Sequence, residues 1–113
     1  MVTITYKEDP IDKVVTLQVR GHSGKSPIGH DIVCSAISIL TYTVAQIFTA
    51  MDRGGDFQRP AVIMLDSGNA YISAVCRDGD IYGEAVRVML YAITGYRLLE
   101  ATYPEFIQFG EDS

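Results

Sequence analysis

The sequence has few of the features that indicate a membrane protein, a disulfide framework or a metal cluster. It has no tryptophan and only two cysteines, Cys34 and Cys76. The two cysteines form no CxxC motif, so both are expected to be free thiols in a reducing compartment. The sequence also lacks a basic segment followed by an apolar one, and an uninterrupted apolar run of about 18 residues. We therefore expect a cytoplasmic protein with no membrane segment.

Positive charge is also scarce. Nine lysines and arginines stand against fourteen acidic residues, which gives a net charge of −5. The basic residues are scattered along the chain and form no patch that would attract a phosphate backbone. Direct binding of nucleic acid is therefore disfavoured, and a basic polypeptide is the better partner for this charge.

The length of 113 residues fits one domain, residues 1–113, with no repeat, linker or low-complexity segment. Apolar residues at helical spacing predict helices over about 31–51 and from about 79 to Tyr103-Pro104. Alternating apolar residues and turn signals predict strands at 2–6, 14–20, 60–65, 70–76 and 105–109.

The predicted order is β-β-α-β-β-α-β. Strands joined as hairpins, with two helices that must bury apolar stripes, predict an α+β fold: a mostly antiparallel sheet with two helices packed on it. The helices are very apolar for so small a monomer, so a homodimer is expected to bury the remaining surface.

The chemistry concentrates around Cys34. If Asp31 caps the following helix, Cys34 lies in its first turn, where unpaired N–H groups and the positive end of the helix dipole favour a thiolate. A first-turn amide, including that of Cys34, is the natural oxyanion donor. A histidine could act as general base, and both His22 and His30 lie within twelve residues of Cys34. Spacing alone does not choose between them.

Each of these residues also has a structural interpretation. Cys34 could be a small buried apolar residue. However, it begins a row of small side chains on one helix face, Cys34-Ser38-Thr41-Ala45, which leaves space above the sulfur. Ser38 could bond to its own helix backbone or donate near the reaction centre. Cys76 follows an apolar strand with no histidine near it in sequence, and we interpret it as structural.

Residues 22–30, between the strand at 14–20 and the helix of Cys34, are predicted to form a loop of about nine residues, which is long for a compact domain. Gly24 and Gly29 allow large changes of backbone conformation there. We expect this loop to be mobile and to close on a substrate.

Together these residues resemble the ribosomal-processing cysteine proteases, whose pattern is G-H-x, a short variable loop, and then G-x-D-x-V-C-[AS]-[AG]-x-S. The matching segments are Gly21-His22-Ser23 and Gly29-His30-Asp31-Ile32-Val33-Cys34-Ser35-Ala36-Ile37-Ser38. Ser23 and Ser35 stand where many members have alanine.

The resemblance implies that Cys34 is the nucleophile and His22, rather than His30, the base. It also implies a homodimer without a cofactor. The implied substrate is the N-terminal extension of a large-subunit ribosomal protein, cut after an aromatic residue, or a phage capsid or scaffold protein.

Three other interpretations stay open at this point. The chain could be a non-enzymatic ribosome-associated or dimerisation module with a structural Cys34. A metal site formed by His22, His30, Asp31 and Cys34 has suitable ligands but no established ligand spacing. A Cys34–Cys76 redox pair lacks the usual motif. We expect no metal.

Overall fold

The computed structural model describes residues 1–21, 30–66 and 68–110, with the side chains of residues 30 and 31 left out. The element order is the predicted one, β-β-α-β-β-α-β. The elements are β1 (Val2–Asp9), β2 (Val14–Arg20), α1 (His30–Arg53), β3 (Val62–Asp66), β4 (Asn69–Val75), α2 (Gly79–Thr102) and β5 (Ile107–Phe109).

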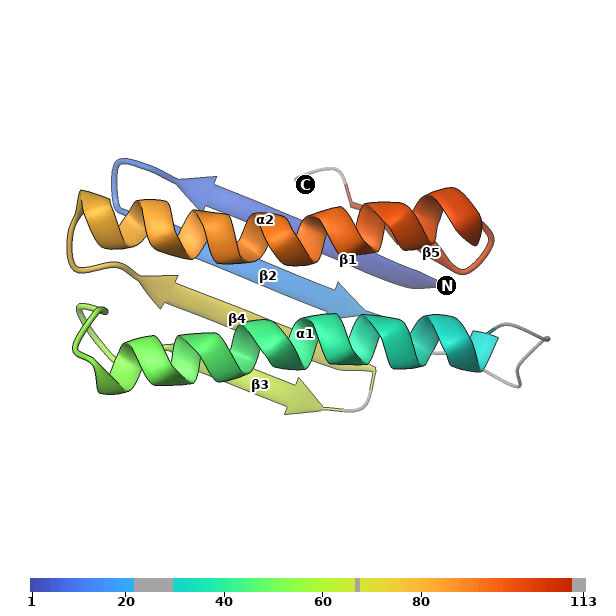
Figure 1. Cartoon of the computed structure of the whole chain (residues 1–113), viewed down its shortest axis with the longest axis horizontal. Coiled ribbons are helices and arrows are strands. Elements are labelled where there is room, and N and C mark those ends of the chain that lie inside the picture. Colours follow the sequence, from blue (N-terminus) through green and yellow to red (C-terminus); the bar gives the residue numbers. More distant parts are fainter. Residues whose placement is uncertain (22–29, 67, 111–113) are drawn as a thin grey trace.

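The five strands form one sheet in the order β3-β4-β2-β1-β5 (Figure 1). The two predicted hairpins are present, since β1 pairs with β2 and β3 with β4, both antiparallel. β2 and β4 are also antiparallel, whereas β5 lies parallel to β1. The prediction of a mostly antiparallel sheet is therefore confirmed.

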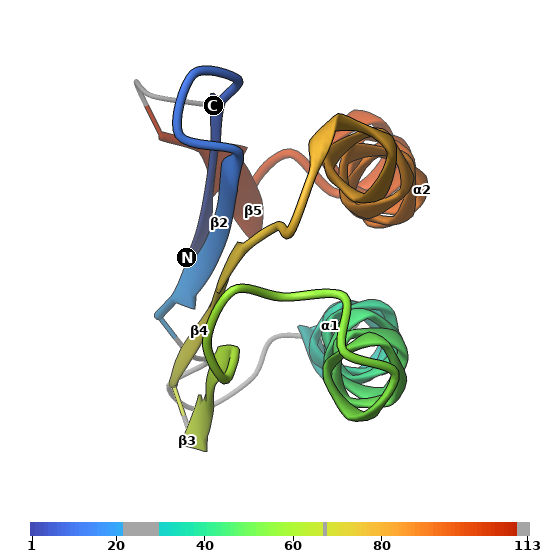
Figure 2. The same cartoon turned by 90° about the vertical axis from the view of Figure 1, so that its left-hand side faces the viewer.

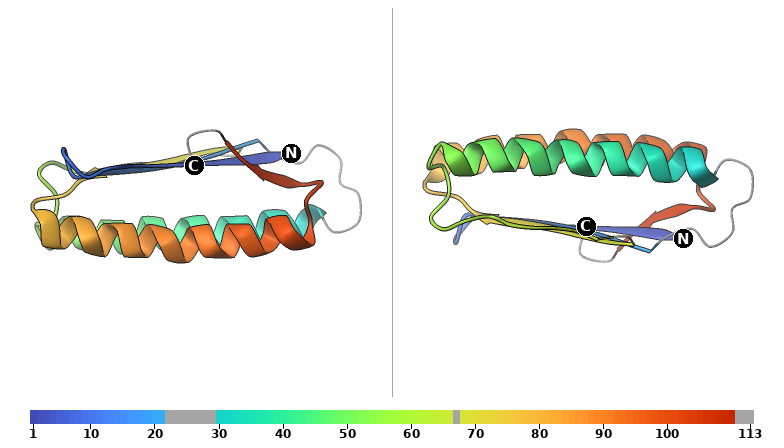
Figure 3. Two further views of the ribbon diagram at one scale, coloured as in Figure 1. Left: turned by 90° about the horizontal axis from the view of Figure 1, so that it is seen from above. Right: turned by 90° about the horizontal axis from the view of Figure 1, so that it is seen from below.

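Both helices cover the same face of this sheet (Figure 2), and the views from above and below show two layers (Figure 3). Strand residues that alternate in sequence divide accordingly. Ile4 and Leu17 point toward the helices and are buried, while Thr5 and Gln18 lie in a shallow hollow on the other face. On the uncovered face β1 and β2 present mainly polar side chains, and the apolar core lies between the layers.

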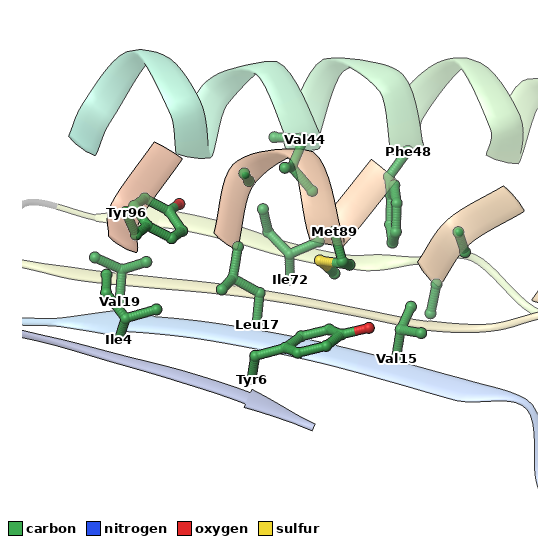
Figure 4. Packing of buried hydrophobic residues seen from close by; sticks show 14 of the residues in the cluster. Ile4, Tyr6, Val15, Leu17, Val19, Val44, Phe48, Ile72, Met89 and Tyr96 are labelled. Carbon is green, nitrogen blue, oxygen red and sulfur yellow. The ribbon is translucent and has the colours of Figure 1, made fainter. Parts of the chain in front are cut away.

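The core is built from large side chains of both layers (Figure 4). Its largest fully buried members are Tyr96, Phe48, Ile4, Leu17, Ile72 and Met89. Burying one aliphatic or aromatic side chain of this size contributes about 1.5–3 kcal/mol. This core holds α1 and α2 against the sheet.

Some element boundaries differ from the prediction. β1 continues to Asp9, because residues 7–9 pair with residues 14–16 of β2 where a turn was expected. β4 ends at Val75, so Cys76 lies just beyond it, in an isolated bridge with Phe57. β3, β4 and β5 differ from their predicted limits by one or two residues at their ends.

The prediction that Asp31 is the N-cap of α1 is wrong. The helix already begins at His30, and a cap is the last residue before helical conformation starts. Asp31 is therefore in the first turn, where the positive end of the helix dipole still stabilises a carboxylate. By contrast, α2 begins as predicted, with Asp78 as its cap accepting a 2.9 Å hydrogen bond from the Ile81 amide.

The expectation that no segment could span a membrane needs a correction. Residues Ile32–Arg53 of α1 are long and apolar enough to do so by length and composition alone. In the fold, Val33, Val44 and Phe48 of this helix are buried in the core. One face of α1 therefore packs in the core, whereas Ile32, Ile39 and Ile47 on its other side are exposed.

Candidate active site

A groove of about 360 Å³ lies between the first half of α1 and one end of the sheet. The sheet contributes the start of β1, the end of β2 and the β3–β4 turn, which meet at this end because their strands are antiparallel. The helix contributes Cys34, Ile37, Ser38, Thr41 and Tyr42, and the sheet contributes Val2, Val19, Gly21, Leu65, Asp66, Gly68, Asn69 and Ala70.

Cys34 and Ser38 both line this groove. Cys34 is a half-buried cysteine outside any disulfide, and Ser38, one helical turn further, is exposed. Thr41 continues the same row along the groove, whereas Ala45 is buried in the core. The row of small residues noted in the sequence therefore lies beside an open space from Cys34 to Thr41.

The start of α1 changes the expected oxyanion donor. Cys34 is the fifth helical residue, and in a regular α-helix the fifth N–H is bonded to the first carbonyl. We therefore no longer expect the amide of Cys34 to be that donor. The earlier amides of the first turn keep this role as a prediction.

Gly21 is the last described residue before position 22. It has a φ of 103°, and a Cβ on it would overlap the carbonyl oxygen of Met1. Its N–H donates a 3.0 Å hydrogen bond to the carbonyl of Gly68 in the β3–β4 turn. Only glycine fits these conditions, so the chain leaves β2 at the rim of the groove in a fixed direction.

Several predicted site residues are not placed by the structure. His22, Gly24 and Gly29 lie outside the described residues, and only the backbone of His30 and Asp31 is described. Their roles stay predictions. No cluster of three metal-binding side chains occurs in the described part of the chain, but that part excludes the histidines.

Cys76 has a different environment from Cys34. It is fully buried, and burial raises the pKa of its thiol to about 11, with smaller contributions from Asp56 and Asp78. The thiol is therefore protonated at neutral pH and poorly nucleophilic. Neither cysteine is part of a disulfide.

A contact beneath the groove was not predicted from the sequence. The hydroxyl oxygens of Thr41 and Tyr96 lie 2.6 Å apart and join α1 to α2. Thr41 belongs to the row of small residues that begins at Cys34, and this row was the only feature of the sequence that pointed to the contact. Tyr96 lies 55 residues further along the chain, on a helix face that the pattern assigns to the core.

Comparison with known proteins also indicates a cysteine protease. The family model "Cysteine protease Prp" matches residues 1–108. Among curated proteins, no sequence gives a significant match.

Solved structures share the fold over nearly the whole chain. The ribosomal processing protease Prp of S. aureus with a covalently linked product peptide has a TM-score of 0.69 at 24% identity, covering 97% of this chain and 98% of that one. The same protease with a substrate peptide gives 0.68 at 21% identity, with the same coverage. SMU.848 from Streptococcus mutans gives 0.66 at 20% identity, covering 96% and 95%. With the family model matching almost the entire sequence, the chain belongs to the Prp family of cysteine proteases.

Proposed function

We propose that this protease is an endopeptidase that removes the N-terminal extension of a large-subunit ribosomal protein, with Cys34 as nucleophile and His22 as general base. The observation that carries the proposal is the position of Cys34: a half-buried cysteine outside any disulfide, near the start of a helix and on the wall of a groove. The resemblance at residues 21–38 assigns His22 as its partner.

The reaction follows the usual course for a cysteine nucleophile. The sulfur of Cys34 attacks the scissile carbonyl, and amide donors stabilise the oxyanion. His22 transfers the thiol proton to the leaving amine, which releases the downstream product. Water, activated by the same histidine, then hydrolyses the thioester. In this scheme Ser38 donates a hydrogen bond near the reacting atoms.

The groove suits an extended peptide with one large apolar side chain. Val19, Ile37 and Leu65 supply apolar surface beside Cys34, and Tyr42 is an exposed aromatic at the rim. An aromatic residue before the cleaved bond would bury its ring on this surface. The net charge of −5 favours a basic tail, as ribosomal proteins carry, by long-range attraction.

The loop with Gly24 and Gly29 and the carboxylate of Asp31 complete the proposed site. We propose that the loop closes over the substrate and that Asp31 supports the start of α1 through the helix dipole. A ribosomal substrate would place the enzyme in the cytoplasm. If the chain serves a phage, its substrate is a capsid or scaffold protein.

We also propose a homodimer formed by the outer surface of the helices. This surface exposes Ile39 and Ile47 of α1 and Leu90 and Leu98 of α2. Exposed apolar patches of this kind are typical of interfaces. Light scattering should give the mass of a dimer, and Ile39→Lys combined with Leu98→Lys should give that of a monomer.

Peptides that span the predicted cleavage site test the function. One peptide carries phenylalanine before the cleaved bond, and its matched control carries alanine there. We expect rapid cleavage of the first after phenylalanine and at least about tenfold slower cleavage of the second, since losing a buried side chain of this size costs about 1–3 kcal/mol. Equal rates would contradict the apolar subsite, and no cleavage of either would favour the non-enzymatic module.

A further inference from the structure

A buried polar contact joins the two helices beneath the groove. Tyr96 of α2 is fully buried and Thr41 of α1 is 2% exposed, the only polar residue in the buried core of the described chain apart from the tyrosines. Their hydroxyl oxygens are 2.6 Å apart. This bond is costly to break, because the Tyr96 hydroxyl would be left unsatisfied away from water, while Thr41 would keep only its bond to the Ile37 carbonyl.

The direction of this hydrogen bond is fixed by a second one. The Thr41 hydroxyl donates its single proton to the carbonyl of Ile37 at 2.7 Å, so it can only accept from Tyr96. Burial raises the pKa of the Tyr96 hydroxyl to about 12, and it therefore keeps its proton at neutral pH. The chain of bonds runs from Tyr96 to Thr41 to the Ile37 carbonyl.

This chain of bonds ends close to the nucleophile. The Ile37 carbonyl belongs to the same peptide group as the Ser38 amide, and in a regular helix that amide donates to the carbonyl of Cys34. Cys34, Ser38 and Thr41 all line the groove. Tyr96 is thus linked to the stretch of α1 that presents the thiol.

The helices also approach closely at this point. A Cβ on Gly95 would lie 2.7 Å from Cδ1 of Leu40, so a larger residue there would require the Leu40 side chain to shift. Apolar contacts limit how near the helices come but are non-directional. The hydrogen bond to Thr41, by contrast, is directional.

We propose that Tyr96 is a positioning residue for Cys34. Tyr96 acts through Thr41: it holds the groove-facing half of α1 in the rotation that directs the Cys34 sulfur at the substrate carbonyl. The inference rests on the proposed peptidase function. A misplacement of about 1 Å at the reacting atoms can lower a rate by about 10²-fold, so loss of one orienting bond should lower turnover measurably.

Tyr96→Phe tests this, with Tyr6→Phe as the matched control. Tyr6 is also a buried tyrosine whose hydroxyl bonds a side chain, Glu8 at 2.8 Å, but Glu8 lies on β1 rather than on the helix of Cys34, and Tyr6 lies apart from Tyr96 (Figure 4). With the peptide substrate, we expect Tyr96→Phe to lower kcat about tenfold at unchanged KM. We expect Tyr6→Phe to keep the wild-type kcat. An unchanged kcat in folded Tyr96→Phe would overturn the proposal.

A second measurement needs no substrate. We expect amide hydrogen exchange in Tyr96→Phe to rise at least tenfold over residues 34–41 and to stay unchanged over residues 44–52. An equal rise in both segments would mean that Tyr96 supports only global stability, and would overturn the proposal. If the wild type failed to cleave the peptide, the proposed function would fail, while the exchange pattern would still decide whether Tyr96 holds this half of α1.

The double variant Thr41→Val/Tyr96→Phe distinguishes a positioning role from simple destabilisation. Removing both hydroxyls leaves no unsatisfied group, so thermal stability should return close to wild type. The positioning role predicts that kcat stays low in this variant. Recovery of kcat together with stability would show a purely structural contact.

Discussion

Gly21 offers a quantitative test of how the strand end before His22 is held. In Gly21→Ala the new Cβ would overlap the Met1 carbonyl oxygen, and φ is 103°. A left-handed conformation costs a non-glycine residue about 1–2 kcal/mol. Escape from the clash would break the bond to Gly68, which costs about another 1 kcal/mol. We expect a loss of about 3 kcal/mol in the free energy of unfolding, measured by urea denaturation.

Two other glycines serve as matched controls. Gly55 has a φ of 78° with open space around it, so Gly55→Ala should cost only the conformational term of about 1–2 kcal/mol. Gly83 lies within α2 with open space around it, so Gly83→Ala should stabilise by about 0.5–1 kcal/mol.

Activity adds a second readout to this series. A domain with 5–15 kcal/mol of stability stays folded after a loss of about 3 kcal/mol, so slower peptide cleavage by Gly21→Ala would report displacement of His22. We expect at least a tenfold loss, with wild-type rates for both controls. If Gly21→Ala proved no less stable than Gly55→Ala and fully active, the reasoning about this strand end would be refuted.

Three further predictions concern the cysteines and histidines. At pH 7.5 iodoacetamide should modify Cys34 in the folded protein and spare buried Cys76, which peptide mapping would show; preferential labelling of Cys76 would reverse our assignment. His22→Ala should lower turnover by about 10²–10⁴-fold and His30→Ala only mildly, and the opposite result would make His30 the base. Because burial raises the pKa of the Cys76 thiol from 9.0 to about 11, the protonated thiol is favoured in the folded state. Its contribution to stability is fully present below about pH 9 and is lost as the pH rises through about 11. Urea denaturation of Cys76→Ala should therefore lack roughly 1–3 kcal/mol of the wild-type decline over that window, and an unchanged decline would contradict this.

The fold was largely predictable because its signals are local. Alternation in residues 14–20 and helical spacing after Asp31 each reflect one buried face of one element, and that face is buried in the structure. The continuation of β1 to Asp9 was missed because Asp9-Pro10 is a turn signal, and pairing with β2 outweighs it for Asp9 itself. The cap of α1 was misplaced by the same kind of local signal.

The site was predictable only in part. Cys34 and Ser38 share one helix face, so their common position on the groove follows from helix periodicity. Thr41 and Tyr96 meet only because α1 and α2 lie side by side on the sheet. The bond from Gly21 to Gly68 likewise depends on strand order, since it joins the ends of β2 and β4. Contacts between distant segments leave no periodic trace in a single sequence.

The proposed function requires that the Cys34 thiol cleaves a ribosomal protein. Intact mass spectrometry of the full-length large-subunit ribosomal protein from the same genome, after incubation with wild-type enzyme or with Cys34→Ala, tests this without a model peptide. We expect loss of the N-terminal extension at one bond, after an aromatic residue, with the wild type only. An unchanged mass with both, or the same cleavage by folded Cys34→Ala, would contradict it.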